Sequence, residues 1–306
     1  MPHPDLSQAM HGVIVTTVTP FAPDGSLDPG SIEPQIRHVI SGGVRVLVPC
    51  GNTGEFSSLG HDEIKTVISA TKSAAPDHAI VIAGVGGASV TAIDQARHAQ
   101  EEGVDAVMVH HPSHTYIDRD ALIGYYQRII DAVDIGVVLY KRGPEQTDNV
   151  ITELVAHEQV IAVKYAVNDL NAFAMLVDRA GADACAWVCG SAERWAPFFH
   201  LAGAVGFTSG LANFAPQQAV TLFDALSRGD MTVAMDVRRR LTGFEELRQA
   251  RHNANNVPAV KEAMRQKNLD SGVVREPLQH LSPADRSLVA AILQEWSVPR
   301  PDAVAT

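Results

Sequence analysis

The most informative single residue is Lys164, which lies near the end of the apolar run VIAVKY at residues 160–165. A lysine amine at the end of a buried strand is removed from water, which disfavours its charged form and lowers its pKa. The neutral amine is a nucleophile that can condense with a carbonyl group. The alternative is a lysine whose ammonium group reaches solvent beyond the end of the strand.

Tyr140 ends the preceding apolar run, DIGVVLY at residues 134–140. If the two runs are neighbouring strands, its phenol lies beside Lys164 and can carry a proton to and from a reacting group. The alternative is an aromatic side chain that only fills space at the strand end.

Asn52 and Thr53 belong to the segment GNTGE at residues 51–55, which follows another apolar run. Its two glycines suit a tight turn. The backbone N–H groups of such a turn, together with the Thr53 hydroxyl, suit a small carboxylate. A turn with no ligand is the alternative.

Three histidines near the end of a further run, His110, His111 and His114, raise the possibility of a zinc site. However, adjacent residues of a strand point to opposite faces, so His110 and His111 should diverge. The first apolar run, GVIVTTV, offers only hydroxyl groups. The segment GVGG at 84–87 lacks the spacing of a dinucleotide-binding loop. We therefore expect neither a metal nor another cofactor.

The elements that must position these residues alternate regularly. Continuous apolar runs are typical of strands covered on both faces, as in a parallel sheet. Eight of them occur, at 12–18, 44–50, 79–85, 104–110, 134–140, 159–165, 185–190 and 204–210. Helical patterns lie between them, for example at 32–43, 61–74, 90–103, 120–133 and 151–158.

This alternation predicts an α/β fold, a (β/α)8 TIM barrel, with a doubly wound open sheet as the alternative. After residue 228 only helical patterns follow, at 231–252, 257–268 and 282–296. We therefore predict a barrel with the active site over residues 1–228 and a C-terminal helical domain over 229–306. Residues at the carboxyl ends of the strands then share one face of the barrel.

Composition excludes several classes of protein. The chain has 306 residues, with 24 Lys and Arg against 35 Asp and Glu, and a net charge of −11 argues against a nucleic-acid partner. We expect neither a membrane span, since no long uninterrupted apolar run occurs, nor a secretory signal. The cysteines are too few for a disulfide framework, so we expect a cytoplasmic protein. They are Cys50, Cys185 and Cys189.

Taken together, these motifs resemble the dihydrodipicolinate synthase and N-acetylneuraminate lyase family. The resemblance runs from Gly12 to about Trp296 and rests on TTVTPF, GNTGE, the strand-end tyrosine and VIAVKYAVND. It implies a homo-oligomeric barrel, usually a tetramer, that forms a Schiff base with pyruvate or another 2-oxo acid. In that case Lys164 forms the imine, Tyr140 moves protons, and the Asn52–Thr53 pair holds the substrate carboxylate.

Three departures set the chain apart from the synthases of that family. Asn52 stands where they carry a hydroxyl residue of a proton relay, and an amide cannot pass a proton in the same way. His114 falls where the relay has a second tyrosine. Arg142 comes two residues after Tyr140, closer than the arginine that binds the synthases' second substrate.

We therefore predict a divergent member of the family, a lyase of the aldolase or dehydratase type, in which Arg142 and His114 also contact substrate. A true 4-hydroxy-tetrahydrodipicolinate synthase is the first alternative, and a sialic-acid-type aldolase is a weaker one. A metal-dependent barrel hydrolase and a non-catalytic ligand sensor are alternatives from other classes.

Overall fold

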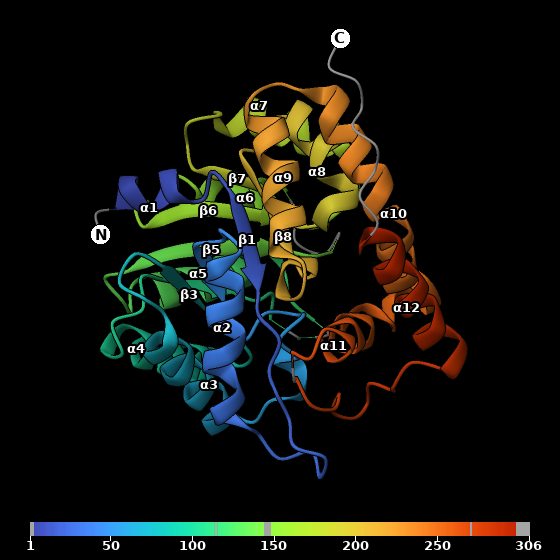
Figure 1. The fold of residues 1–306 in the computed structure, drawn as a ribbon. Coiled ribbons are helices and arrows are strands. Elements are labelled where there is room, and N and C mark those ends of the chain that lie inside the picture. Colours follow the sequence, from blue (N-terminus) through green and yellow to red (C-terminus); the bar gives the residue numbers. More distant parts are fainter. Residues whose placement is uncertain (1–2, 113, 115, 144–147, 270, 298–306) are drawn as a thin grey trace.

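The fold is a closed barrel of eight parallel strands. The computed structural model describes residues 3–112, 114, 116–143, 148–269 and 271–297. Its strands are hydrogen-bonded in chain order, and the first pairs with the last, with Val13 opposite Phe207. The predicted (β/α)8 barrel is confirmed (Figure 1), and the open-sheet alternative is wrong.

The strands begin within the predicted apolar runs, and all their residues are buried. This explains the continuous hydrophobicity, because each strand packs against helices outside and against other strands' side chains inside. They are β1 (Val13–Thr16), β2 (Val46–Val48), β3 (Ile80–Val85), β4 (Ala106–Val109), β5 (Gly136–Lys141), β6 (Val160–Tyr165), β7 (Ala186–Cys189) and β8 (Gly206–Ser209).

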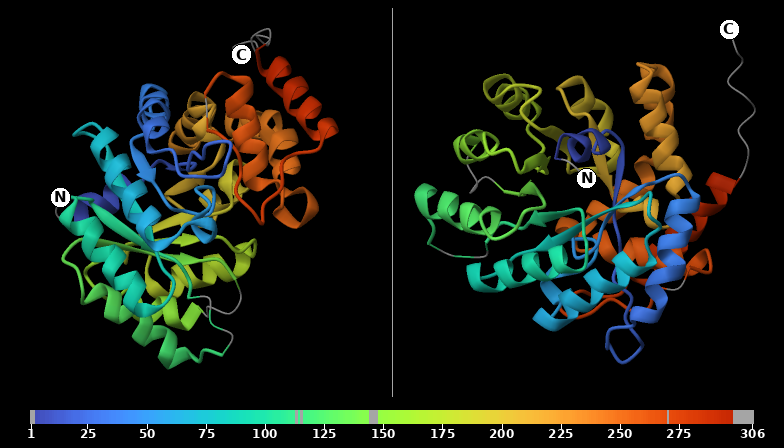
Figure 2. Two further views of the ribbon diagram at one scale, coloured as in Figure 1. Left: turned by 90° about the horizontal axis from the view of Figure 1, so that it is seen from below. Right: turned by 90° about the vertical axis from the view of Figure 1, so that its left-hand side faces the viewer.

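One helix follows each strand and covers the outside of the barrel (Figure 2). In chain order these are α2 (Ile32–Ser41), α3 (His61–Ala74), α4 (Ser89–Glu101), α5 (Arg119–Ile130), α6 (Asp148–Leu154), α7 (Leu170–Ala180), α8 (Ala192–Leu201) and α9 (Pro216–Ser227). A short helix, α1 (His3–Ala9), precedes β1, and the side chains of Leu6 and Met10 join the core inside the barrel.

Three 3-10 turns complete the barrel: η1 (Pro29–Ser31), η2 (Phe56–Ser58) and η3 (Leu211–Asn213). The second follows the GNTGE segment directly and so lies beside the expected site. No helix in the described part of the chain combines the length and apolarity that a membrane crossing needs.

The C-terminal helices are α10 (Met231–Asn253), α11 (Asn256–Gln266) and α12 (Pro283–Ser297). Helix α10 packs against α8 and α9 at one side of the barrel, whereas α11 contacts α10 and η3, and α12 contacts α10 and α11 (Figure 1). Phe214 from the loop after β8 and Phe244 of α10 share a core with Val260 of α11 and Ile292 of α12. The helices predicted after residue 228 are therefore confirmed, whereas the division into two domains stays a prediction.

Side chains alternate between the two faces of each strand, which decides what enters the barrel. Val138 and Tyr140 of β5 and Ala162 of β6 belong to the core inside it. Lys164 has the same parity as Ala162 and therefore shares that face. The strand register thus points both expected catalytic groups at the carboxyl-terminal mouth.

Candidate active site

The structure brings Lys164 and Tyr140 together at the barrel mouth. Strands β5 and β6 pair with Tyr140 directly opposite Lys164. The lysine Nζ atom lies 4.3 Å from the centre of the tyrosine ring. A nucleophile and an acid–base group are therefore adjacent.

The Lys164 amine is buried and poised to lose its proton. Its pKa falls to about 7, first because burial disfavours the ammonium and then because of the positive charge of Arg142. Cys189 opposes this shift. A substantial fraction of the amine is therefore neutral at neutral pH, whereas an ordinary lysine would be almost fully protonated.

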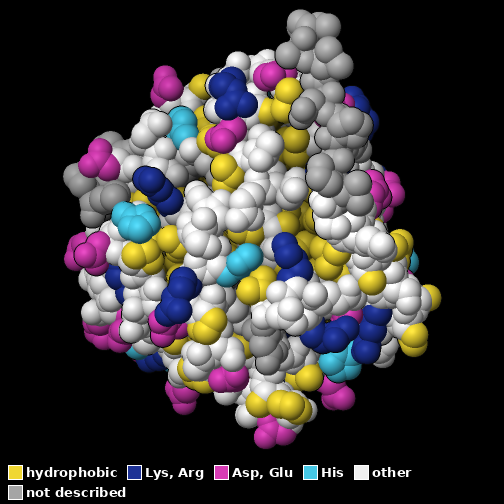
Figure 3. Space-filling view, in the orientation of Figure 1, with side chains coloured by type: hydrophobic (Ala, Val, Ile, Leu, Met, Phe, Trp, Pro, Cys, Tyr) yellow, Lys and Arg dark blue, Asp and Glu magenta, His cyan; other side chains and the backbone are white. Residues whose placement is uncertain are grey.

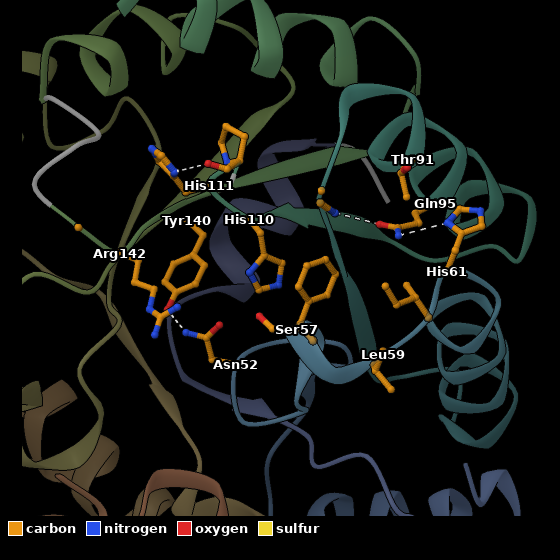
Figure 4. Close-up of a pocket in the computed structure, with 16 residues that line it drawn as sticks. Asn52, Ser57, Leu59, His61, Thr91, Gln95, His110, His111, Tyr140 and Arg142 are labelled. Atoms are coloured by element: carbon orange, nitrogen blue, oxygen red, sulfur yellow. Dashed lines mark hydrogen bonds between the residues drawn. The ribbon is translucent and has the colours of Figure 1, made fainter. Parts of the chain in front are cut away.

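Tyr140 stays protonated and is oriented by Asn52. Burial raises its pKa to about 12, with the charge of Arg142 acting in the opposite direction. The Asn52 amide nitrogen donates a hydrogen bond of 2.7 Å to the phenol oxygen. Because that oxygen accepts from the amide, its own proton can be donated elsewhere, for example to a substrate. Asn52 and Arg142 both reach toward the hydroxyl end of Tyr140 (Figure 4).

The turn that carries Asn52 and Thr53 is tightly constrained. Its flanking residues Cys50 and Glu55 are non-glycine residues with left-handed backbone, at φ 56° and 58°. A Cβ atom on Gly54 would lie 2.8 Å from the carbonyl oxygen of Thr17, so only glycine permits this approach to the residue that follows β1. Thr53 is buried within the turn.

His110 forms part of the site wall, and its ring is neutral at neutral pH, with a single N–H. Its ring stacks on Phe56 at 4.0 Å and meets the edge of Tyr140 at 5.6 Å. Its Nε2 lies 2.9 Å from the carbonyl oxygen of Cys50, which accepts the ring N–H. Burial lowers its pKa to about 4. Phe56 was not predicted, although its place directly after GNTGE puts it at the mouth.

His111 turns away from His110, as the strand parity predicts, and its ring interacts with the carbonyl of Pro112 (Figure 4). Across the described ranges, no three His, Cys, Asp or Glu side chains gather in a way that could hold a metal ion. The histidines therefore offer no support for the hydrolase alternative.

A cavity of about 630 Å³ opens at this end of the barrel. Asn52, Tyr140 and Arg142 line one part of it, and His61 and Gln95 line another. The second part was not predicted, because its side chains come from the outer helices α3 and α4.

His114 lies apart from this cavity. It is exposed, lines a different hollow and accepts a hydrogen bond from the backbone N–H of Tyr116. The expectation that it takes the place of the relay's second tyrosine has no support within this chain. A substrate contact by His114 stays a prediction from the sequence. Residues 144–147 of the segment after Arg142 lie outside the described residues.

Comparisons with known proteins agree with this geometry. A model described as the dihydrodipicolinate synthetase family matches residues 9–296. The chain belongs to this family. It is therefore a lyase, as the sequence indicates.

Relatives match over nearly their whole length. A 4-hydroxy-tetrahydrodipicolinate synthase from Acidiphilium cryptum is 32% identical over 288 residues, covering 92% of this chain and 97% of its own. The crystal structure of dihydrodipicolinate synthase from Oceanobacillus iheyensis is 36% identical with a TM-score of 0.93, covering 96% and 99% of the two chains. A prophage protein of the family from E. coli K12, solved in complex with pyruvate, is 25% identical with a TM-score of 0.86, over 93% and 97%.

Proposed function

We propose that Lys164 is the residue through which this lyase forms a Schiff base with pyruvate or another 2-oxo acid. The neutral amine attacks the C2 carbonyl carbon, and the resulting carbinolamine loses water to give a protonated imine. The imine nitrogen then draws electrons, so that a proton or carbon group at C3 can leave and an enamine forms. The observation that carries this proposal is the buried Lys164 amine, 4.3 Å from the Tyr140 ring.

Tyr140 supplies and removes protons in this scheme. Its phenol is protonated at neutral pH and lies beside the amine, so it can protonate the carbinolamine hydroxyl as water leaves. Asn52 and Thr53 receive the carboxylate of the 2-oxo acid at the turn after β2. No step requires a metal or another cofactor.

We infer the type of reaction from the residues that can contact the part of the substrate beyond its 2-oxo acid group. Arg142 lines the cavity next to Tyr140, where a guanidinium can pair with a carboxylate or with hydroxyl groups. Asn52 donates to Tyr140 and does not relay a proton. Both features favour an aldolase or dehydratase acting on a longer 2-oxo acid.

A true 4-hydroxy-tetrahydrodipicolinate synthase is the second candidate, and the name of the A. cryptum relative favours it. The deciding experiment is a coupled assay with pyruvate and aspartate semialdehyde. We expect little or no synthase activity. A specificity constant above ~10⁵ M⁻¹s⁻¹, typical of efficient enzymes, would establish the synthase instead.

Reductive trapping of the imine identifies which 2-oxo acid the protein accepts. The protein is incubated with pyruvate or with a sugar-derived 2-oxo acid and reduced with borohydride. The mass of the intact chain is then measured by mass spectrometry. We expect one covalent adduct per chain, unaffected by a metal chelator. If no 2-oxo acid gives an adduct, the Schiff-base proposal is wrong.

We further propose that the chain assembles into a homo-oligomer, a tetramer or a dimer. The side chains of Val90 and Tyr116 are 81% and 86% exposed and are therefore accessible to a second copy of the chain. Light scattering measures the assembly directly, and a monomer at micromolar concentration would contradict it.

Acidic and basic side chains are interspersed over the face shown in Figure 3, unlike a nucleic-acid footprint. The cytoplasmic location stays a prediction from the sequence.

A further inference from the structure

The turn that carries Asn52 and Thr53 is held by Lys261 of α11 and by Arg275 in the segment between α11 and α12. Glu55, two residues after Thr53, has a side chain with no exposed surface. One of its oxygens lies 2.6 Å from the Nζ of Lys261 on α11, which is itself only 4% exposed. The other oxygen accepts a hydrogen bond of 2.9 Å from the backbone N–H of Arg275.

The contacts of Glu55 hold a turn whose backbone conformation is unfavourable for non-glycine residues. Cys50 and Glu55, at its two ends, both adopt the left-handed backbone that favours glycine. Residues in such conformations persist where their surroundings fix them. The Thr19 hydroxyl holds the turn from the barrel side by donating to the carbonyl of Gly54 at 2.7 Å. Glu55 is its attachment on the opposite side.

Lys261 is fixed in turn by groups outside the site. Its Nζ donates a hydrogen bond of 2.6 Å to the carbonyl of Val273 and lies 4.5 Å from the centre of the Phe21 ring. In the described part of the chain, the cavity lining includes Asn52 but neither Glu55 nor Lys261. The charged groups of Glu55 and Lys261 are buried against each other and bound to the backbone of Arg275 and Val273, so the pair acts on a substrate through the turn.

We propose that Glu55 and Lys261 are a positioning pair that sets the turn at Asn52 and Thr53 and thereby the affinity for the substrate carboxylate. The inference rests on the proposed function, because it assigns the pair to 2-oxo acid binding. In this proposal the C-terminal helices affect substrate binding through Lys261 of α11, although Lys261 itself does not contact the substrate.

The experiment compares Glu55→Gln, Lys261→Met and the double variant with the wild type. Each single change leaves a buried charge without its partner and should lower the unfolding midpoint. The double variant removes both charges and should regain most of that loss. In all three, the pyruvate concentration that gives half-maximal borohydride trapping should rise by ~10-fold or more, the scale of one hydrogen bond to a charged group.

Two further readouts separate positioning from folding. The maximal adduct per folded chain should stay as in the wild type, because Lys164 itself is unchanged. Arg265→Gln is the control, since Arg265 pairs with Glu262 on the same helix and is exposed. It should leave the half-saturating concentration unaltered.

The possible results differ in meaning. A stable double variant with the wild-type half-saturating concentration would show that the pair only stabilises the fold, and would overturn this inference alone. Failure of all three variants to fold would also overturn it, since a positioning role requires the barrel to survive without the pair. If the wild type itself gives no adduct with any 2-oxo acid, the proposed function fails and this inference fails with it.

Discussion

Two features of its surroundings lower the pKa of Lys164, and each of them can be changed separately. Burial comes from the strand β6 and the barrel interior, whereas the second contribution comes from the positive charge of Arg142. The amine is reactive only when neutral, so imine formation should speed up as pH rises through about 7, far below the range of an ordinary lysine.

Replacing Arg142 should move that pH profile. Arg142→Gln removes a positive charge that disfavours the ammonium, so the pKa of Lys164 should rise and the midpoint of the profile should shift upward. Arg142→Lys keeps the charge and serves as the control. The measurement is the rate of imine formation against pH, with samples quenched by borohydride. An identical midpoint in all three proteins would show that Arg142 does not act on Lys164.

Tyr140 can be tested against a tyrosine on the other face of the neighbouring strand. Tyr140→Phe should lower turnover of the true substrate by ~10²–10⁴, the usual effect of losing a positioned acid–base group. Tyr165 packs against Phe173 outside the barrel, so Tyr165→Phe should keep turnover close to that of the wild type. Equal effects of the two changes would assign Tyr140 to packing.

At the scale of elements, the position of the turn after β2 depends on the close approach of β3 to its backbone. A Cβ atom on Gly84 of β3 would lie 2.1 Å from the carbonyl oxygen of Cys50. Gly84→Ala should therefore push the turn outward and destabilise the fold by ~1–3 kcal/mol, as overpacking does.

Gly12 provides the matched control for that substitution. A Cβ atom there meets nothing within 4 Å, so Gly12→Ala should change stability by no more than about 0.5 kcal/mol. Urea unfolding of both variants measures the difference. The explanation is wrong if the two alanine variants are equally stable.

The sequence predicts elements well where a pattern is local. Each strand is visible as a continuous apolar run, and strand parity is enough to place Tyr140 beside Lys164. The anchoring of Glu55 by Lys261 has no local pattern, because the two residues are far apart in the chain and meet only when α11 docks. The exposed position of His114 has no local pattern either, because tertiary contacts set where a loop side chain lies.

At the scale of the whole molecule, the C-terminal helices and the barrel share both apolar and ionic contacts. Phe214 packs against Phe244, and Glu55 is buried against Lys261. Separating the two parts would expose aromatic surface and leave a buried charge unpaired. We therefore expect them to unfold as one unit, whatever their boundary near residue 228.

Hydrogen exchange at increasing urea concentrations tests this expectation. Amides of β6 in the barrel and of α11 should become exchangeable at the same denaturant concentration, because neither part is stable without the other. Opening of α11 at a clearly lower concentration would show that the helices form a separate, weaker unit.

The central claim is that one particular lysine forms the imine, and peptide mapping tests it most directly. The protein is reduced with borohydride in the presence of pyruvate, digested, and analysed by mass spectrometry. Lys141 and Lys261 are also buried, but each is held by an acidic partner. We predict that the reduced pyruvyl group is found on Lys164 alone. An adduct on Lys141 or Lys261, or an unmodified Lys164 after incubation with every 2-oxo acid tested, would contradict the account.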